Sequence, residues 1–259
     1  MATEGPPDAD LTDDAFLGGR LRVLQPARGF RSGIDAVLLA AAAPAEAGER
    51  VLDVGTGAGV AALCLARRVE GVAVTGIEIQ PDLCALARAN AGRNGLAGTV
   101  AIVEADVRAP TRALGQAGVT RGGFDHVIAN PPFYQEGRAR PAGDPGKARA
   151  NMLGPEDLER WVRFMVSMAR PGGTVTLVHR TDALPRLLAL LERRAGAVTV
   201  LPLHPRAGER SGRVLVTGRT GSRAPFALLP GLVLHGDGDA FTPEADAILR
   251  HGAALVLGV

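Results

Sequence analysis

The chain has 259 residues, of which 46% are hydrophobic, 22% charged and 3% aromatic, and its formal net charge is +2. These values are ordinary for a globular protein with a sizeable core, and the net charge alone does not indicate nucleic-acid binding. Residues 1–10 lack the basic and apolar regions of a signal peptide, and the apolar run 36–43 is too short to span a bilayer. The sequence therefore favours a cytoplasmic protein without a membrane segment.

Positive charge is concentrated in the second half of the chain. Residues 1–130 hold 12 Arg and Lys against 15 Asp and Glu, whereas residues 131–259 hold 17 against 12. Lys147 is the only lysine, so nearly all of the positive charge comes from arginine.

The two cysteines, Cys64 and Cys84, do not have metal-ligand spacing, and we expect reduced thiols and no metal site.

The first 45 residues are expected to form an extension of the main domain. Residues 1–10 are acidic and proline-rich, which predicts a disordered tail. Gly18 and Gly19 separate two short segments and predict a hairpin, and residues 32–43 predict a helix that ends before Pro44. We therefore divide the chain into a tail at 1–10, an N-terminal hairpin and helix at 11–45, and a main domain at 46–259.

Strands and helices are predicted to alternate through the main domain. The expected strands are 50–55, 72–79, 99–106, 124–130, 174–179, 198–205 and 212–220. The expected helices are 59–70, 81–95, 154–170 and 182–196. Such alternation predicts an α/β fold with a doubly wound, mostly parallel seven-stranded sheet. The last two strands follow each other without a helix, which predicts an antiparallel edge.

A glycine-rich loop, "DVGTGAGV", joins the first of these strands to a helix. Gly55, Gly57 and Gly59 allow a sharp turn and close approach of a ligand to the backbone. The dinucleotide fingerprint requires a glycine at the sixth position counted from Gly55, but that position is Val60. A nicotinamide site is therefore disfavoured.

Acidic residues follow the same edge of the predicted sheet. Asp53 precedes the glycine loop, Glu78 ends the second strand of the domain and Asp106 ends the third. A carboxylate at the end of the second strand can accept hydrogen bonds from both hydroxyls of a ribose, and Asp106 is placed to accept one from an adenine amino group. Each alone is also consistent with a solvated loop charge, but three acidic strand ends in register predict a cofactor site.

The tetrapeptide Asn130-Pro131-Pro132-Phe133 comes directly after the fourth strand of the domain. Two prolines would simply end a strand. The side-chain oxygen of Asn130 and the carbonyl of Pro131 can also accept both hydrogens of one amino group. They would orient its lone pair and stabilise the charge that develops as nitrogen attacks. Pro132 stiffens the turn, and Phe133 offers a face to a planar group such as an unstacked base.

These two segments resemble motifs one and four of the class I S-adenosylmethionine-dependent amino-methyltransferases. The resemblance implies a Rossmann-like fold and direct methyl transfer to nitrogen without a metal or covalent intermediate. It implies catalytic roles for Asn130, Pro131, Pro132 and Phe133. It implies S-adenosylmethionine as cofactor, bound by Asp53, Gly55, Thr56, Gly57, Gly59, Glu78, Ile79, Asp106, Val107 and Asn130.

Several flanking segments resemble one bacterial family more closely. They are "RSGIDAVLLAAAAP", "NPPFYQEG", "KARA", "LHPRAGERSGRVLVTGRTG" and "FTPEADAILR". Together, over roughly residues 12–250, they are similar to the tRNA adenine-N6 methyltransferases that modify the anticodon-adjacent adenine of a valine tRNA. This likeness places Ser32 and Asp35 near the cofactor pocket, although they would equally serve as a helix N-cap and a first-turn charge. Phe133 stands where that family often has tyrosine.

An RNA substrate, most simply a tRNA, follows from the resemblance. The expected substrate-binding residues are Phe133, Tyr134, Arg138, Arg140, Lys147 and Arg149, in and beside an irregular insert at 134–154. A second basic group is Arg206, Arg210 and Arg213. Each group is equally consistent with a solvated basic loop.

Other functions remain open at this point. A base amino-methyltransferase of ribosomal RNA would use the same motifs. A protein glutamine N5-methyltransferase would also use them, but about 45 residues before the main domain leave little room for the helical domain that such enzymes usually carry. An RNA-binding module with a vestigial cofactor fold is disfavoured by the intact Asn130 and glycine loop.

Overall fold

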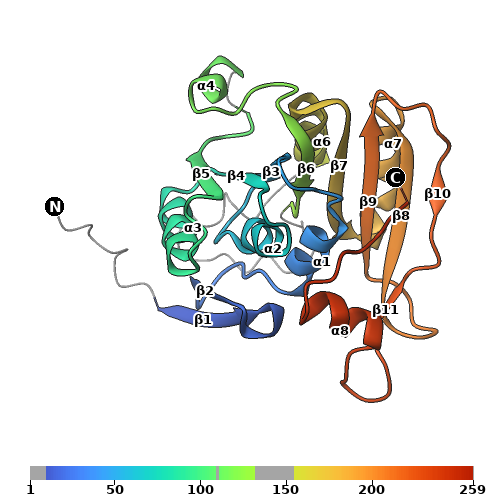
Figure 1. Ribbon diagram of the computed structural model, residues 1–259. Helices are drawn as coiled ribbons and strands as arrows, with labels where there is room; N and C mark the ends of the chain where they lie inside the picture. The colour runs from blue at the N-terminus through green and yellow to red at the C-terminus, as the bar shows by residue number, and fades with distance from the viewer. Residues whose placement is uncertain (1–9, 109–110, 132–154, 259) are drawn as a thin grey trace.

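The computed structural model describes residues 10–108, 111–131 and 155–258 (Figure 1). The main domain is built on one large sheet with helices on both faces. The strands are β3 (Arg50–Val54), β4 (Ala73–Glu78), β5 (Val100–Glu104), β6 (Phe124–Ala129), β7 (Ala169–Arg180), β8 (Ala195–Arg206), β9 (Arg213–Thr220), β10 (Ala227–Leu228) and β11 (Leu232–His235). Their order is β10-β8-β9-β7-β6-β3-β4-β5, and β11 also pairs with β8.

The predicted α/β fold with a mostly parallel sheet is confirmed. Strands β7, β6, β3, β4 and β5 are parallel neighbours, and β9 is antiparallel to both β7 and β8. All seven predicted strands are present, but the sheet has nine strands in the part of the chain that the structure describes. The difference arises because residues 227–228 and 232–235 add short strands parallel to β8.

The antiparallel strand lies inside the sheet rather than at its outer edge. The crossover from β7 to β8 passes through helix α7 (Leu184–Glu192) and leaves a space one strand wide. After a short turn, β9 returns into that space and pairs with both strands. The expected antiparallel pairing of the last two strands is therefore confirmed, but β8 and its two small partners form the border.

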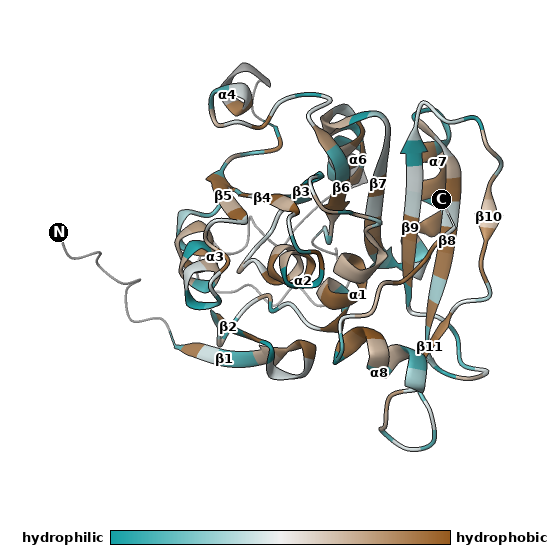
Figure 2. Cartoon of the chain, viewed as in Figure 1, coloured by the Kyte–Doolittle hydropathy of each residue, from teal (hydrophilic) through white to brown (hydrophobic). Residues whose placement is uncertain are grey.

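Helices cover the two faces of the sheet. One hydrophobic cluster joins α1 (Ile34–Ala42), α2 (Val60–Arg68) and α3 (Pro81–Arg93) to the sheet, and α8 (Pro243–Leu249) adds to it. A second cluster packs α6 (Pro155–Met168) and α7 on the opposite face, and the small helix α4 (Thr111–Gln116) follows β5. Figure 2 shows hydrophobic residues along the strands and on α1 and α2. Within the described ranges, none of the helices is long and apolar enough to cross a bilayer.

The helix predicted at 154–170 is confirmed as α6, and it is amphipathic. Its residues at spacings of three and four are all buried: Leu158, Trp161, Val162, Met165 and Met168. The predicted end at residue 170 is wrong in detail, because α6 ends at Met168 and strand β7 begins at Ala169. The pairing of β7 with β6 contains a register shift, which accommodates Pro171, Gly172 and Gly173 within the strand.

The N-terminal hairpin is confirmed and lies over the α1–α3 layer. Strands β1 (Leu11–Phe16) and β2 (Leu21–Pro26) are antiparallel and are joined by the short 3-10 helix η1 (Leu17–Gly19). The side chain of Asn90 accepts a hydrogen bond from the Leu24 amide and donates one to the Leu24 carbonyl and one to the Ala58 carbonyl. This buried amide attaches the hairpin to α3 and to the glycine loop.

Ser32 does not cap α1, and the N-cap is Gly33. The Gln25 amide, which is 2% exposed, instead pairs with the backbone of Ser32. The Ser32 N–H donates to Gln25 Oε1 over 2.8 Å, and Gln25 Nε2 donates to the Ser32 carbonyl over 3.1 Å. Asp35 is the predicted first-turn charge, and its carboxylate binds Arg213 of β9 over 3.1 Å.

Candidate active site

The predicted cofactor and catalytic residues that the structure describes lie along one edge of the sheet. The carboxyl ends of β6, β3, β4 and β5 are adjacent at this edge. Ligands of open parallel sheets bind at such an edge. The three carboxylates are not in register, however, because Asp53 is paired with Gly76, whereas Glu78 is paired with Glu104. Asp53 therefore lies two residues deeper than Glu78, and Asp106 lies two residues beyond the end of β5.

The glycine loop needs glycine at each of its three positions. Gly55, Gly57 and Gly59 have φ angles of 70°, 56° and 91°, which ordinary side chains rarely adopt. A Cβ atom on Gly55 would overlap the ring of Trp161 in α6, whereas the space beside Gly57 is open. The open side of Gly57 gives a bound ligand access to the backbone, and Gly59 is the N-cap of α2.

Asp53 is buried under this loop. Its carboxylate accepts a hydrogen bond of 2.6 Å from the hydroxyl of Thr56, which is also buried. Burial raises the pKa of Asp53 from 3.8 to about 6, and the negative charge of Glu78 adds to this effect, although the Thr56 hydrogen bond opposes it. The folded chain therefore holds a costly buried carboxylate beside the glycine loop, and a cationic group placed near it would offset that cost.

The Glu78 carboxylate accepts hydrogen bonds from three backbone amides. One of its carboxylate oxygens accepts hydrogen bonds from the Ile79 and Gln80 amides, over 2.8 and 3.0 Å, and the other accepts one from the Gly57 amide over 3.0 Å. A carboxylate has about four acceptor positions, so capacity remains for a ribose hydroxyl. The next side chain, Ile79, is 47% exposed, which leaves an apolar surface available to a flat ring at the same edge.

Asp106 is held by a neighbouring arginine. The backbone amide of Arg108 donates to its carboxylate over 2.8 Å, and the Arg108 guanidinium forms a further ion pair over 2.9 Å. Partial burial raises the pKa of Asp106, but the hydrogen bonds and charge of Arg108 outweigh it, so the pKa lies below 3.8. Val107 is half-buried between them. Arg108 was not among the predicted site residues, although its position two residues after Asp106 is a signal that could have identified it.

Asn130 has an unused acceptor. It follows β6 directly, and its Oδ1 is buried without a hydrogen-bond partner among the described residues. Pro131, the next residue, is also buried. Buried polar atoms are nearly always hydrogen-bonded, and exceptions require an explanation. An oxygen of this kind at the ligand-binding edge is suited to accept a hydrogen bond from an amino group that arrives with the substrate.

Several predicted residues lie outside the described residues. They are Pro132, Phe133, Tyr134, Arg138, Arg140, Lys147 and Arg149. Of the second basic group, Arg206 ends β8 and Arg213 begins β9, so the turn that carries Arg210 lies at the same edge as Asn130. Among the residues described, no group of His, Cys, Asp and Glu side chains could hold a metal ion.

Sequence comparison identifies the family. Residues 32–142 match the family model described as "Methyltransferase small domain". A Porphyromonas gingivalis protein named tRNA1(Val) (adenine(37)-N6)-methyltransferase is 30% identical over 248 residues, which cover 90% of this chain and 92% of that protein. The chain belongs to this methyltransferase family. An Aeromonas hydrophila protein of the same name is 28% identical over 189 residues, 72% of this chain and 75% of that one.

A solved structure supports the assignment at the level of the fold. The crystal structure of a predicted O-methyltransferase from Agrobacterium tumefaciens has a TM-score of 0.73 and 30% identity, and the match covers 87% of this chain and all of that one. The methyltransferase described here is thus an enzyme that uses S-adenosylmethionine, as expected from the glycine loop. The residues present fit that cofactor, because Gly57 leaves an open approach and Ile79 an exposed apolar face.

Proposed function

We propose that this methyltransferase methylates the exocyclic N6 of an adenine in tRNA, and that its target corresponds to the anticodon-adjacent adenine named for its relatives. The observation that carries the proposal is the buried Asn130 Oδ1 without a partner among the described residues. That atom is an acceptor only, so it suits an amino group, which has two hydrogens to donate. A hydroxyl substrate has one hydrogen and would need that hydrogen removed by a base.

The proposed chemistry needs orientation rather than a covalent intermediate. Asn130 Oδ1 and the Pro131 carbonyl accept the two N–H groups of the adenine, which turns its lone pair toward the methyl group. When bound, S-adenosylmethionine supplies an electrophilic methyl group on sulfur. Methyl transfer would form the N–C bond and break the C–S bond, with the thioether as leaving group, and the two acceptors would stabilise the positive charge on nitrogen until a proton leaves to water.

The cofactor residues have separate proposed roles. Glu78 accepts hydrogen bonds from the ribose hydroxyls, and Ile79 covers one face of the adenine ring. Asp106 and Val107 bind the edge of that ring, which requires Arg108 to share or release the Asp106 carboxylate. Asp53, Thr56 and the glycines of the loop contact the methionine portion. The raised pKa of Asp53 supports this role, because a cationic amino group nearby would favour its ionised form.

The arginine-rich segments are proposed to bind the phosphates of the RNA. They comprise Arg138, Arg140, Lys147 and Arg149 of the insert, with Arg206, Arg210 and Arg213 of the β8–β9 turn. Phe133 and Tyr134 are proposed to stack on the target base. Such binding releases counterions, so RNA affinity is expected to fall steeply between low and moderate salt. We further propose a cytoplasmic enzyme in which residues 11–45 support the catalytic domain 46–259.

Transfer of labelled methyl groups tests the proposal. The purified enzyme is incubated with labelled S-adenosylmethionine in three separate reactions. One contains tRNA, one ribosomal RNA and one a ribosome-free protein extract, each from cells that lack the enzyme. Label in tRNA, recovered as N6-methyladenosine, is the expected result. Label in ribosomal RNA would move the substrate to another RNA, and label in a protein glutamine would move it to another amino group. Label recovered as an O-methylated product would refute the role of Asn130.

A further inference from the structure

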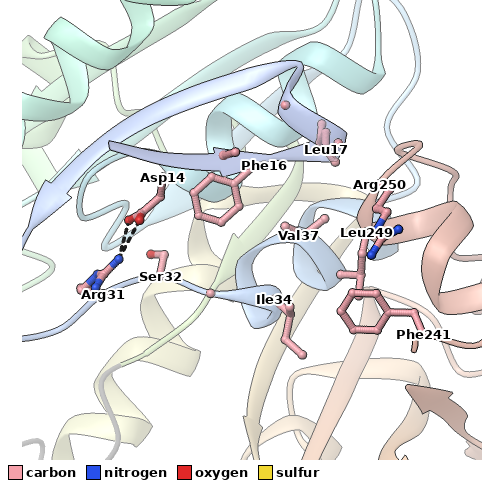
Figure 3. A pocket seen from close by; sticks show the side chains of 14 residues that line it. Asp14, Phe16, Leu17, Arg31, Ser32, Ile34, Val37, Phe241, Leu249 and Arg250 are labelled. Atoms are coloured by element: carbon pink, nitrogen blue, oxygen red, sulfur yellow. Dashed lines mark hydrogen bonds and ion pairs between the residues drawn. The ribbon is translucent and has the colours of Figure 1, made fainter. Parts of the chain in front are cut away.

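A groove beside the N-terminal hairpin is lined by none of the proposed catalytic or cofactor-binding residues. It has a volume of about 630 Å³ and lies between the N-terminal hairpin, the start of α1 and the end of α8 (Figure 3). Its walls are mainly apolar: Phe16, Leu17, Ile34, Val37, Phe241 and Leu249. Arg31 and Arg250 lie at its rim, together with Asp14.

Hydrophobic side chains are exposed next to this groove. Phe30 directly precedes the groove-lining Arg31 in the sequence and is 51% exposed, and Ile34, which lines the groove at the first position of α1, is 37% exposed. On the far wall, the ring of Phe241 stacks on His235 with centroids 4.9 Å apart, and the guanidinium of Arg250 lies over it at 5.8 Å. This wall therefore combines two stacked rings with a guanidinium, groups that can contact an aromatic ligand with negative charge.

The segment that carries Phe30 is held in place. Gln25 pairs with both backbone groups of Ser32, and Asp14 forms an ion pair of 2.7 Å with Arg31. These contacts fix the backbone on the C-terminal side of Phe30. Because the backbone next to Phe30 is already ordered, ligand binding costs little further backbone entropy there, and the exposure of Phe30 is compatible with a binding role.

The start of α1 lies at the same edge of the sheet as Asn130. Asp35 in its first turn binds Arg213, the first residue of β9. Arg213 is paired with Arg180, the last residue of β7, and β7 is the direct neighbour of β6, which leads into Asn130. A substrate whose reactive base reaches Asn130 therefore extends readily across β7 and β9 toward Phe30.

Charge favours a nucleic acid over a neutral apolar partner. Arg28 forms no ion pair in the described part of the chain, and only one nitrogen of the Arg31 guanidinium contacts Asp14. Donors therefore remain on both sides of Phe30 for phosphate oxygens. An adenine presented for N6 chemistry must leave its stack, which leaves the neighbouring base without a partner on one face.

We propose that Phe30 and the groove lined by the residues that follow it form a stacking site for an unpaired nucleotide that flanks the target base in the RNA substrate. Phe30 and Ile34 contact the base, and Arg28 and Arg31 contact its phosphates. This site rests on the proposed RNA methylation and would make the N-terminal extension part of substrate recognition. It adds affinity for RNA and leaves the cofactor site unchanged.

Phe30→Ala tests the site, with Phe226→Ala as a matched control. Phe226 is 54% exposed and precedes β10 at the border of the sheet, so both substitutions remove an exposed ring. Binding of a fluorescently labelled anticodon stem-loop RNA is measured by anisotropy, and cofactor binding by the emission of Trp161. Loss of one stacked base weakens RNA binding about tenfold. That loss is expected for Phe30→Ala alone, with cofactor affinity unchanged in both variants.

A base analogue locates the contact. 2-Aminopurine, whose emission is quenched by stacking, is placed in turn on each side of the target adenine. One of the two positions is expected to change emission on binding to the wild-type enzyme but not to Phe30→Ala. Equal RNA affinity for both enzymes, or an equal 2-aminopurine signal, would overturn the stacking site while methylation by the wild type still stood. Failure of the wild type to methylate RNA would instead refute the proposed function.

Discussion

The ring of Trp161 lies directly against the backbone of Gly55, so closely that a Cβ atom at Gly55 would overlap it. Trp161 belongs to α6, which follows the insert at 134–154 in the sequence, whereas Gly55 opens the cofactor loop. This contact packs the helix behind the insert against the cofactor site. It also gives an optical probe, because Trp161 is the only tryptophan in the chain.

Gly55→Ala is expected to disrupt this contact and the loop with it. The new methyl group meets Trp161, and the φ angle of 70° is strained for alanine, so stability should fall by about 2 kcal/mol or more. Titration with S-adenosylmethionine, followed by Trp161 emission, should show a large signal in the wild type and none in the variant at the same concentrations. Wild-type affinity in the variant would show that the loop tolerates a side chain there.

Asn130→Ala is expected to separate catalysis from binding and folding. The variant loses the acceptor that orients the amino group, so kcat should fall by about 100-fold or more. Its stability should stay the same or rise slightly, because a buried oxygen without a partner among the described residues is removed. Single-turnover methylation and urea unfolding measure the two effects. Asn130→Asp, which keeps an acceptor oxygen, serves as control and should retain more activity than alanine.

Asp53→Asn is expected to stabilise the protein in a pH-dependent way. The folded chain has a pKa of about 6 at Asp53 against 3.8 when unfolded, so it holds the proton more tightly than the unfolded chain does. The buried carboxylate therefore costs nothing below pH 3.8, and its cost grows until the pH passes about 6. Since each pKa unit corresponds to about 1.4 kcal/mol, the full cost approaches about 3 kcal/mol.

The matching measurement is urea unfolding of wild type and Asp53→Asn at pH 5 and pH 8. The gain in unfolding free energy should be about twice as large at pH 8 as at pH 5. Asparagine keeps an oxygen that accepts from Thr56, so that hydrogen bond does not confound the comparison. Gains that are equal at both pH values would contradict the raised pKa of Asp53.

Glu78→Gln is expected to weaken cofactor binding although it changes a single atom. The Glu78 carboxylate accepts three backbone N–H groups, from Gly57, Ile79 and Gln80. Glutamine has only one acceptor oxygen, so its NH₂ must face at least one of these donors. Calorimetry should show S-adenosylmethionine affinity reduced about tenfold or more, since both the loop and the ribose contact are affected. A loss confined to stability, with unchanged affinity, would remove Glu78 from the ribose site.

Seven of the strands and the edge on which the site is built could be predicted from the sequence, whereas the position of β9 inside the sheet could not. Alternating apolar and helical patterns identify β3 to β9, and the glycine loop marks where β3 ends. Strands β10 and β11 could not be predicted in this way. They are two and four residues long, and their pairing depends on the exposed border of β8 rather than on a pattern of their own.

The finer geometry of the site depends on contacts between distant segments. Asp53 lies deeper than Glu78 because it is paired with Gly76, two residues before Glu78 at the end of β4, and this register becomes known only from the pairing of the two strands. Arg108 on Asp106 is a local contact that an arginine two residues downstream could have suggested. The backbone pairing of Ser32 with Gln25 and the packing of Trp161 on Gly55 both join elements far apart in the sequence. They become visible only once the chain is folded.

The most direct test of the central claim is the product formed on a single RNA. An unmodified valine tRNA transcript is incubated with the enzyme and S-adenosylmethionine, digested to nucleosides and analysed by mass spectrometry with chromatographic standards. We predict one N6-methyladenosine per transcript with the wild-type enzyme and almost none with Asn130→Ala. A transcript that stays unmethylated, or that carries its methyl group on a ribose oxygen or a ring nitrogen, would contradict the assignment of Asn130 to an adenine amino group.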